Sequence, residues 1–583
     1  MESESSKSNV HEHHSGSVLN TSAIEKAATD LETMTVTENQ HEGEPDNNGN
    51  YLSGFAMWML AIALMFGVFV MALDNNIICT SSVLSSTFNL TNNAATAIPR
   101  ITSHFNSLDD VGWYGSAYLL FQMSLQPTYG KIYTYFNVKW TYIVAVSLFE
   151  LGSIVIATAQ NSPAFIIGRA LAGSGAAGIF SGSLIIIGLT VPLRRRPTFI
   201  AFVSSMYGVA SVAGPLLGGV FTESRALTWR FCFWINLPFG AFTVLLVLLY
   251  FKNPSRVDQS LSMKQKIAKI DLLGAFFLIV GMVALLLALQ WGGVTYPWSD
   301  SRVWGCVLAF GLLIVVFVGL QFRHEDEVTI PLRIITHRTV AASCVYSCLL
   351  AMVINTHAYY LPFYFQAIKG TGPSASGIRL LPYLVSNTAI TLVTGPSISR
   401  VGYYNPFLWV GAALATVGSG LLFTLRVNST VGQWIGYQVP PGLGVGMAVQ
   451  IPFIAVQVVL PAKDMPSGSG LVGFFNALGG AISISIAQNI FASRLVESVD
   501  DIPGVDAATI IHAGATGITS VVSGNATALV REAYNYALTR AFILPIATGA
   551  GAFLVSFAMH WRSVKGREKS DNGIGIEPEG ACD

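Results

Sequence analysis

Two oppositely charged residues lie inside long apolar stretches, where each is costly. On translocon scales, Arg or Asp at the centre of a membrane-spanning helix costs about 2.5–3.5 kcal/mol. Asp74 and Arg169 lie at similar depth in their stretches, so we expect them to pair. A neighbouring arginine favours the ionised carboxylate, whereas burial favours the neutral acid. Movement of Arg169 relative to Asp74 would therefore bind or release a proton. The alternative is a static pair that only fixes the packing.

Three other ionisable residues lie in the apolar stretches: Glu150, His357 and Arg540. Glu150 has no evident basic partner, and we expect it to be protonated or to line a cavity, as a further candidate for proton coupling. We interpret His357 as a hydrogen-bonded interior histidine rather than a proton relay, although it is also a candidate for lining a substrate cavity. Arg540 lies near the end of its stretch, from which its side chain can reach the membrane interface.

Small residues recur with helical spacing in the apolar stretch 199–221. Ala210, Gly214 and Gly218 follow one another at four-residue intervals, which lets another helix approach closely. Pro215 removes a backbone hydrogen bond and should bend the helix. The pattern predicts a pivot or seal, and ordinary helix packing is the alternative. Its main residues are Gly208, Gly214, Pro215, Gly218 and Gly219.

The composition shows what must position these residues. The chain has 583 residues, 52% hydrophobic and 11% charged, with a mean hydropathy of +0.54. Soluble proteins carry about 25% charged residues, so we predict an all-α polytopic membrane protein. The formal net charge is zero, which argues against a nucleic-acid partner. The six cysteines show no paired spacing and indicate neither a disulfide framework nor a metal site.

Fourteen apolar stretches between residues 55 and 560 predict fourteen transmembrane helices. Residues before them are polar and acidic, which predicts disorder, and no charged-then-apolar pattern begins at Met1, so we expect no cleaved signal peptide. The predicted organisation is a disordered acidic cytoplasmic tail (1–53), a six-helix bundle (54–252), cytoplasmic loops with two inserted transmembrane helices (253–338), a second six-helix bundle (339–561) and a cytoplasmic tail (562–583).

Lys and Arg set the expected orientation. One set of loops holds 19 of them and the opposite set 9, and loops rich in Lys and Arg stay in the cytoplasm. We therefore expect both termini to be cytoplasmic. The sequons at Asn89, Asn428 and Asn525 then all lie on the outer side, as glycosylation requires.

An internal repeat links the two predicted bundles. Glycines recur at an offset of 265 residues, and a glycine-rich stretch from Gly173 to Gly178 has a counterpart from Gly442 to Gly446 at a slightly longer offset. Two halves of the same orientation with a substrate site between them are typical of one large transporter fold. The pairs at the constant offset are Gly130 with Gly395, Gly208 with Gly473, and Gly214 with Gly479.

Motifs for enzymatic chemistry are not evident. Gly173-Ser-Gly175-Ala-Ala-Gly178 fits the G-x-G-x-x-G pattern, but it lies in an apolar helix rather than after a strand, so we interpret it as a close-packing face. The phosphate-binding loop of ATP-driven pumps, the zinc motif H-E-x-x-H and a nucleophile elbow in a soluble context are absent from the sequence. We expect no catalytic residues, no cofactor and no metal.

Together these motifs resemble the major facilitator superfamily, specifically its fourteen-helix drug:H⁺ antiporters and the fungal toxin-efflux pumps among them. The resemblance covers about residues 55–560 and implies two six-helix bundles plus two inserted helices. Its antiporter signature matches Gly208 to Gly219, and its helix 4 signature, whose arginine the family links to proton coupling, matches Gly168 to Gly175. Further matches are Leu73-Asp74-Asn75, Trp113 to Tyr118, Trp234-Ile-Asn236-Leu-Pro238 and Tyr360 to Gln366.

The chain departs from this family in two places. The loop after Gly130 lacks the usual acid and second glycine, so its expected gating residues reduce to Gly130, Lys131 and Lys139. The matching loop of the second half keeps more of the pattern, with Gly395, Arg400 and Gly402. In addition, about sixteen residues near Cys79 to Ala94 separate the helix 1 acid from Ala95-Thr-Ala-Ile-Pro99. This insertion is either a retained intron in the gene model or an outer loop.

The resemblance implies a proton-coupled exporter of amphipathic small molecules, such as toxic metabolites and drugs, because the helices offer many aromatics and little fixed charge. The alternatives are a siderophore or amino-acid carrier of the same fold, or a non-transporting sensor. We expect a monomer whose partners are protons, the lipid bilayer and the substrate, in the plasma membrane or alternatively the vacuolar membrane. Candidates for the cavity lining are Asn355, His357, Tyr360, Phe363 and Gln366.

Overall fold

The computed structural model describes residues 54–85, 101, 104–105, 110–224, 227–252, 262–293, 296–322, 328–500, 502 and 526–565. The predicted tail 1–53, most of the insertion near Cys79 to Ala94 and the end of the chain after residue 565 lie outside these residues. Residues 52–583 form one compact unit, and everything below concerns that unit.

The described residues form helices and two isolated bridges, Gly292 with Tyr296 and Tyr403 with Ser563. The first bundle consists of α2 (Gly54–Ser85), α4 (Val111–Tyr135), α5 (Val138–Thr158), α6 (Ser162–Thr190), η1 (Leu193–Arg195), α7 (Arg196–Glu223), α8 (Phe231–Trp234) and α9 (Asn236–Tyr250). The connecting elements are α10 (Met263–Ala268), α11 (Leu272–Trp291), α12 (Ser301–Gln321) and α13 (Leu332–Ile335). The second bundle consists of α14 (Arg338–Phe363), the π-helix η2 (Tyr364–Ile368), α15 (Pro373–Arg379), α16 (Leu381–Val401), α17 (Asn405–Phe423), α18 (Val431–Ala448), α19 (Ile451–Val459), α20 (Met465–Val499), α22 (Ala526–Ala541) and α23 (Ile543–Ser556).

Local sequence explains where several helices begin and end. The side chain of Asn161 accepts a hydrogen bond from Ala164 N at the start of α6. Thr430 and Gln433 form a reciprocal capping box at the start of α18. Helix α16 ends at Gly402, whose φ of +93° is a left-handed conformation that glycine adopts without strain. The polar side chains at the starts of α6 and α18 satisfy backbone N–H groups that have no partner within the helix.

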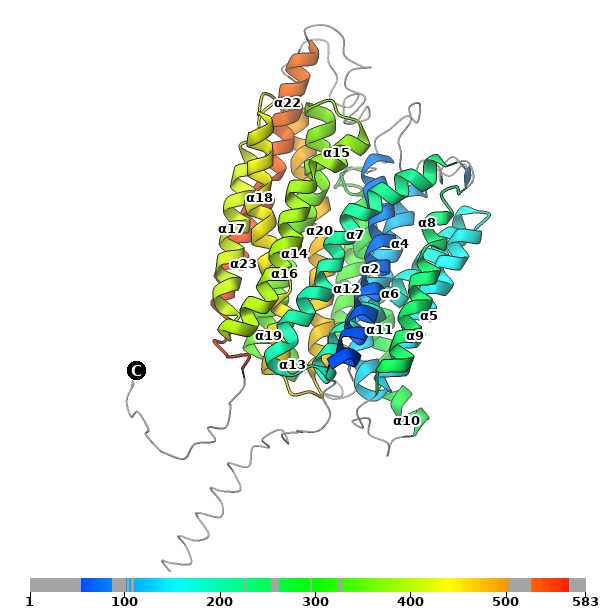
Figure 1. Cartoon of the computed structure of the whole chain (residues 1–583). Coiled ribbons are helices and arrows are strands. Elements are labelled where there is room, and N and C mark those ends of the chain that lie inside the picture. Colours follow the sequence, from blue (N-terminus) through cyan, green and yellow to red (C-terminus); the bar gives the residue numbers. More distant parts are fainter. Residues whose placement is uncertain are drawn as a thin grey trace, which may run out of the picture. The chain divides into compact units, whose positions relative to one another are not determined.

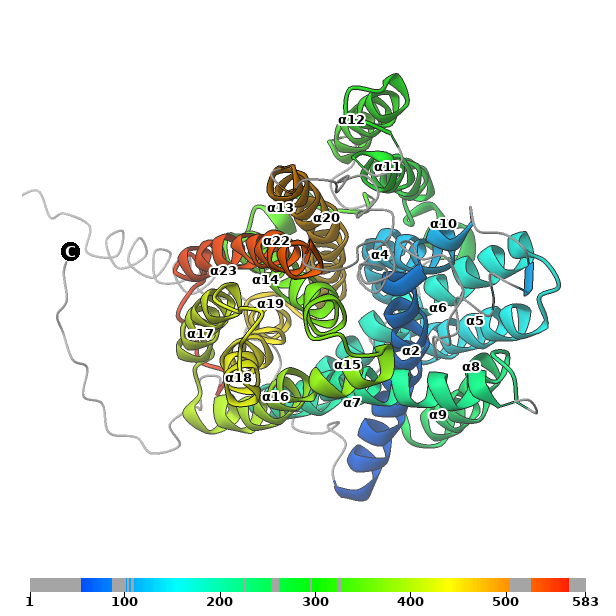
Figure 2. The same ribbon diagram turned by 90° about the horizontal axis from the view of Figure 1, so that it is seen from above.

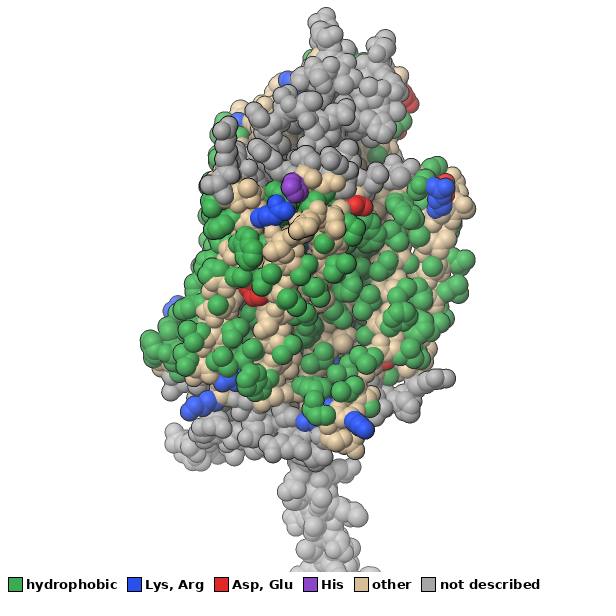
Figure 3. Space-filling view, turned by 90° about the vertical axis from the view of Figure 1, so that its right-hand side faces the viewer, with side chains coloured by type: hydrophobic (Ala, Val, Ile, Leu, Met, Phe, Trp, Pro, Cys, Tyr) green, Lys and Arg blue, Asp and Glu red, His purple; other side chains and the backbone are tan. Residues whose placement is uncertain are grey.

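The helices are long and apolar enough for a membrane. Twelve spans among the described residues meet this criterion, which supports the predicted all-α membrane fold. Helices α4 and α16 are of similar length but less apolar and are not among the twelve, so the count of fourteen stays a prediction. Figure 3 shows one face covered largely by hydrophobic side chains, with Lys and Arg mainly toward its upper and lower margins.

The two bundles lie side by side and meet along two seams (Figures 1 and 2). At one seam α7 packs against α16, and at the other α4 packs against α20. The inserted hairpin, defined as α11 and α12, packs through α11 against both α4 and α20, outside the bundles in Figure 2. We call the end that carries the loops at residues 136–137, 191–195 and 402–404 the basic end, because Lys and Arg concentrate in the loops on that side.

Close packing repeats between the bundles, as the glycine pattern predicts. A Cβ added to Gly173 of α6 would overlap the carbonyl oxygen of Tyr118, and one added to Gly442 of α18 would overlap that of Tyr383. Similarly, Gly175 packs on the backbone of α5 and Gly444 on the backbone of α17. Contacts this close between helices require glycine. The two bundles therefore share one packing scheme, and equivalent positions can be compared directly.

Candidate functional site

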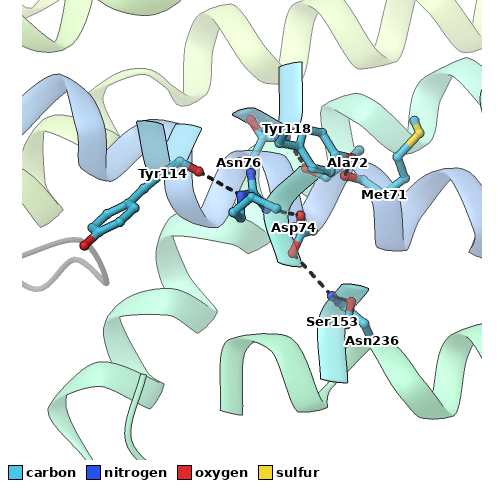
Figure 4. A network of polar contacts seen from close by, with 9 residues as sticks. Met71, Ala72, Asp74, Asn76, Tyr114, Tyr118, Ser153 and Asn236 are labelled. Carbon is cyan, nitrogen blue, oxygen red and sulfur yellow. Dashed lines mark hydrogen bonds and ion pairs between the residues drawn. The ribbon is translucent and has the colours of Figure 1, made fainter. Parts of the chain in front are cut away.

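A charged pair lies buried within the first bundle, and Figure 4 shows the polar contacts around its acid, Asp74. Arg169 of α6 forms an ion pair with Asp74 of α2 through its Nη1 atom, and both side chains have 0% exposure. The Nε of Arg169 donates a 2.8 Å hydrogen bond to the Tyr114 carbonyl oxygen, and the guanidinium lies 4.3 Å from the ring centroid of Tyr118. Two contacts to α4 therefore hold the arginine independently of the acid.

Two polar residues continue this network on the other side of Asp74. The Nδ2 atom of Asn236 lies 3.5 Å from Asp74 Oδ1 and 3.1 Å from Ser153 Oγ. Both residues are fully buried, and Figure 4 shows them next to the carboxyl group of Asp74. Neither Asn236 nor Ser153 was predicted from the sequence to belong to the site. A buried asparagine inside an apolar helix was the signal that could have identified Asn236, because an unpaired amide is costly there.

Glu150 lies one helical turn before Ser153 on α5, further toward the basic end. Both of its carboxyl oxygens are buried, and neither has a hydrogen-bond partner among the described residues. The carboxyl group lies directly against Gly240 of α9, where an added Cβ would overlap Glu150 Oε1. The structure thus brings Asp74 and Arg169 into contact and places Glu150 close to them, without an arginine or lysine of its own.

The second bundle holds neutral residues at the equivalent positions. Gln438 of α18 matches Arg169, and its Nε2 donates a 3.0 Å hydrogen bond to the Arg379 carbonyl oxygen, as Arg169 does to Tyr114. His357 of α14 occupies the depth of Asp74, where it shares a 3.0 Å hydrogen bond with Ser419 Oγ. The charge of the first bundle is therefore not required by the shared packing scheme.

The glycine motif of α7 contacts two different neighbours. A Cβ at Gly208 would overlap the Thr388 side chain of α16, so this glycine lies at the seam between the bundles. Gly214 and Gly218 instead face α2, where an added Cβ would lie 3.0 Å from Asn76 Cβ and 3.5 Å from Ile77 Cγ2, respectively. Pro215 and Gly219 belong to the same helix, but their surroundings lie outside the described part.

The candidate gating residues lie at the basic end. A Cβ at Gly130 would lie 2.9 Å from the Pro466 carbonyl oxygen, and one at Gly395 would lie 2.5 Å from that of Pro197. Both contacts cross between the bundles, and a 2.9 Å hydrogen bond between Thr198 Oγ1 and Ser399 Oγ crosses beside them. Lys131 is buried, Lys139 donates to the Leu248 carbonyl oxygen within the first bundle, Arg400 is exposed, and Gly402 packs against Lys565.

The candidate cavity residues lie mostly inside the second bundle. His357 and Tyr360 are fully or almost fully buried, and Tyr360 OH donates a 3.2 Å hydrogen bond to Gln488 Oε1 of α20. Gln366 is 6% exposed and bonds to Ser376. Asn355 and Phe363 are partly exposed. Their role in a cavity stays a prediction.

The predicted glycosylation sites are only partly described. Asn428 is exposed in the turn between α17 and α18. Asn89 and Asn525 lie outside the described residues.

A family model described as Major Facilitator Superfamily matches residues 64–484. The chain is 43% identical over 540 residues to the MFS-type transporter ltbE of Aspergillus luteorubrus, covering 92% of this chain and 95% of that protein. It is 39% identical over 559 residues to the MFS-type efflux pump MFS1 of Trichophyton rubrum, covering 96% and 100%. It is also 42% identical over 507 residues to the efflux pump roqT of Penicillium rubens, covering 87% and 91%.

Two solved structures share the fold. The proton:xylose symporter XylE has a TM-score of 0.58 and 12% sequence identity, with 87% of this chain and 98% of that chain covered. The human organic anion transporter MFSD10 has a TM-score of 0.53 and 13% identity, covering 85% and 100%. At this identity the likeness supports the architecture alone.

Proposed function

Because this chain belongs to the major facilitator superfamily and is a transporter rather than an enzyme, we propose that it exports amphipathic small molecules in exchange for protons. Export follows the relatives named as efflux pumps, which match almost the whole chain. The observation that carries proton exchange is the buried pair of Asp74 and Arg169. A charged pair inside a membrane bundle is costly and marks a functional site by default.

The geometry suggests how the pair couples to transport. A proton that reaches Asp74 from outside neutralises the carboxylate and removes its attraction to Arg169. When Asp74 is neutral, Arg169 keeps its position, because it still contacts the Tyr114 carbonyl oxygen and the Tyr118 ring. Release of the proton toward the cytoplasm restores the ion pair. The pair thus changes its interaction energy between α2 and α6 each time a proton binds or leaves.

A change in the interaction energy between α2 and α6 can alter access to the substrate site through the seams between the bundles. In the proposed mechanism the bundles rock about a substrate site between them. The close approach of Gly130 to Pro466 and of Gly395 to Pro197 supports closure by these contacts of the basic end, which is the cytoplasmic end in our proposed orientation. Gly208 at the α7–α16 seam serves as the pivot. Lys131, Lys139, Arg400 and Gly402 support the loops behind these contacts.

The proposed substrates are uncharged or weakly charged amphipathic molecules. In the second bundle, His357, Gln438 and Thr416 stand where the first bundle has Asp74, Arg169 and Glu150. An ionic substrate would need a fixed countercharge, and none of these three positions of the second bundle holds an Asp, Glu, Lys or Arg. Asn355 and Phe363 are the partly exposed candidates for contact with the substrate.

We further infer the setting of the protein. The distribution of Lys and Arg supports cytoplasmic termini, and Asn428 is then exposed on the outer side, where it can be glycosylated. Export of toxic molecules is useful at the plasma membrane, and we propose that location and a monomeric state.

The test uses a pump-deficient yeast that expresses the wild type or Asp74→Asn. Growth on a panel of amphipathic toxins and efflux of Nile red, an uncharged amphipathic dye, are measured at equal surface expression. We expect the wild type to raise tolerance and efflux, and the variant to lose both. Equal resistance from both proteins would remove Asp74 from the mechanism. No resistance from either, with both proteins at the surface, would contradict export.

A further inference from the structure

We propose that Glu150 is a second proton-binding residue, which receives the proton from Asp74 on its way to the basic end. This inference rests on the proposed proton exchange. It assigns Asn236, Ser153 and Gly240 as positioning residues. The contacts of Asn236 to Asp74 and to Ser153 hold α5 beside the acid, and the pocket against Gly240 supplies the receiving site.

The first step of the argument is the spacing of the groups. Asn236 bridges Asp74 Oδ1 and Ser153 Oγ with contacts of 3.5 and 3.1 Å, which fixes the serine hydroxyl beside the acid (Figure 4). Glu150 lies three residues before Ser153 on the same helix, and such residues are neighbours with Cβ atoms about 5–6 Å apart. Glu150 therefore lies one helical turn from the serine that Asn236 links to Asp74.

The second step is the state of the Glu150 side chain. Neither carboxyl oxygen has a hydrogen-bond partner among the described residues, and both are buried. An ionised carboxylate is costly to bury without a partner. The nearby positions of α9, which are Asn236, Gly240 and Thr243, are uncharged, and Arg169 is engaged by Asp74. The site therefore has room and an energetic reason to bind a proton.

The third step compares the bundles. Thr416 of α17 occupies the place of Glu150, and a Cβ added to Gly549 of α23 would lie 2.6 Å from its Oγ1. Thr416 satisfies its hydroxyl within its own helix by donating a 2.8 Å hydrogen bond to the Ala412 carbonyl oxygen. The shared packing scheme therefore accepts a small hydroxyl residue at this position. The carboxyl group of the first bundle is an addition that packing does not require.

The transfer itself conserves protons and charge. The Glu150 side chain rotates toward Asp74, the O–H bond of protonated Asp74 breaks, and a new O–H bond forms on the Glu150 carboxylate. Asp74 becomes negative again and pairs with Arg169, and Glu150 becomes neutral. Asn236 takes no proton. Its amide contacts both Ser153 and Asp74 and so fixes their positions relative to each other. Gly240 leaves the space in which the Glu150 carboxyl lies.

The test measures two activities of the full chain in proteoliposomes with Nile red, an uncharged amphipathic dye, as the probe. One is uptake driven by an imposed proton gradient, and the other is exchange of labelled for unlabelled probe without a gradient. For Glu150→Gln and Glu150→Thr we expect gradient-driven uptake to fall at least about tenfold, while exchange stays within about twofold. Exchange is the readout that a merely structural defect would reduce.

Matched variants sharpen the result. Thr416→Val, at the same position of the second bundle, should leave both activities unchanged. Ser153→Ala should slow gradient-driven uptake, and Gly240→Ala should do so by displacing the Glu150 carboxyl. Normal gradient-driven uptake by both Glu150 variants would overturn the relay, while the proposed function would stand if Asp74→Asn still abolished that uptake. A wild type that exchanges the probe but ignores the proton gradient would overturn both.

Discussion

The two bundles use one packing scheme for different chemistry. In the first, Arg169 reaches Asp74 and the Tyr114 carbonyl oxygen. In the second, Gln438 makes the equivalent backbone contact, to the Arg379 carbonyl oxygen, and a further hydrogen bond to the Trp434 carbonyl oxygen of its own helix. The glycines that bring α6 onto α4 and α18 onto α16 make the same kinds of contact in both. Contacts that recur in both bundles are needed for the fold, whereas the charged pair occurs in the first bundle alone, and we propose that it serves energy coupling.

The strongest way to break this comparison is Arg169→Gln, which gives the first bundle the side chain of the second. The variant leaves Asp74 buried without its cation, and breaking a buried pair costs about 3–5 kcal/mol. We expect loss of gradient-driven transport and a clearly lower melting temperature in detergent. The double variant Asp74→Asn with Arg169→Gln should regain most of the stability but not the transport. Wild-type melting of the single variant would contradict a buried ion pair.

A second prediction concerns the parts that recur. Gly173→Ala and Gly442→Ala each place a methyl group onto a neighbouring carbonyl oxygen, of Tyr118 and Tyr383 respectively. Overpacking of this kind costs about 1–3 kcal/mol, and we expect similar losses of thermal stability from the two variants. Gly436→Ala, where an added Cβ meets no atom within 4 Å, is the matched control. A large loss from only one of the pair would show that the packing is not equivalent.

The contacts between the bundles give a third prediction. Gly130→Ala and Gly395→Ala press on Pro466 and Pro197 across the seam at the basic end. We expect both to weaken closure there, so that a cysteine-reactive probe labels a cysteine introduced at Ser399 several-fold faster than in the unsubstituted background. Gly432→Ala, whose added Cβ meets nothing within 4 Å, should leave labelling unchanged. Unchanged labelling in both seam variants would exclude these glycines from the closure.

The smallest effect is expected in the second bundle. Ser419→Ala removes the hydrogen bond to His357 Nε2, and a lost hydrogen bond of this kind costs about 1 kcal/mol. We expect a slightly lower melting temperature and unchanged proton-driven transport. The equivalent change in the first bundle, Ser153→Ala, should slow that transport. Equal transport by the two variants would remove the functional distinction between the bundles.

The sequence predicted the main parts of the fold and the ionisable residues, for physical reasons. Long apolar stretches indicate helices, glycine spacing indicates close contacts, and Asp74 and Arg169 stand out because charge is costly in an apolar stretch. Their surroundings could not be predicted, because the partners of Arg169 on α4 are a carbonyl oxygen and a ring face. These groups leave no distinctive pattern in the sequence.

The same reasoning explains what was missed at Glu150. The sequence reveals an acid without a basic partner, but it does not reveal that Gly240, ninety residues later, leaves the space for its carboxyl group. Helices α4 and α16 were both among the fourteen apolar stretches predicted from the sequence. Each lies at a seam and contacts the opposite bundle, so neither needs a fully apolar surface, which explains why they are less apolar than the twelve helices that meet the criterion for a span.

The inserted hairpin covers one of the two seams between the bundles, so the two seams differ in their exposure to lipid. Helix α11 packs over the line where α4 meets α20, while α7 and α16 expose Val209, Leu216 and Val385 beside their own contact. The hairpin is tied to the second bundle by a 2.6 Å hydrogen bond from Trp298 Nε1 to Asn489 Oδ1, whereas its contact with α4 is built largely of apolar side chains such as Leu120 and Leu278. Helix α11 therefore lies between lipid and the α4–α20 seam, whereas apolar side chains of α7 and α16 are exposed directly.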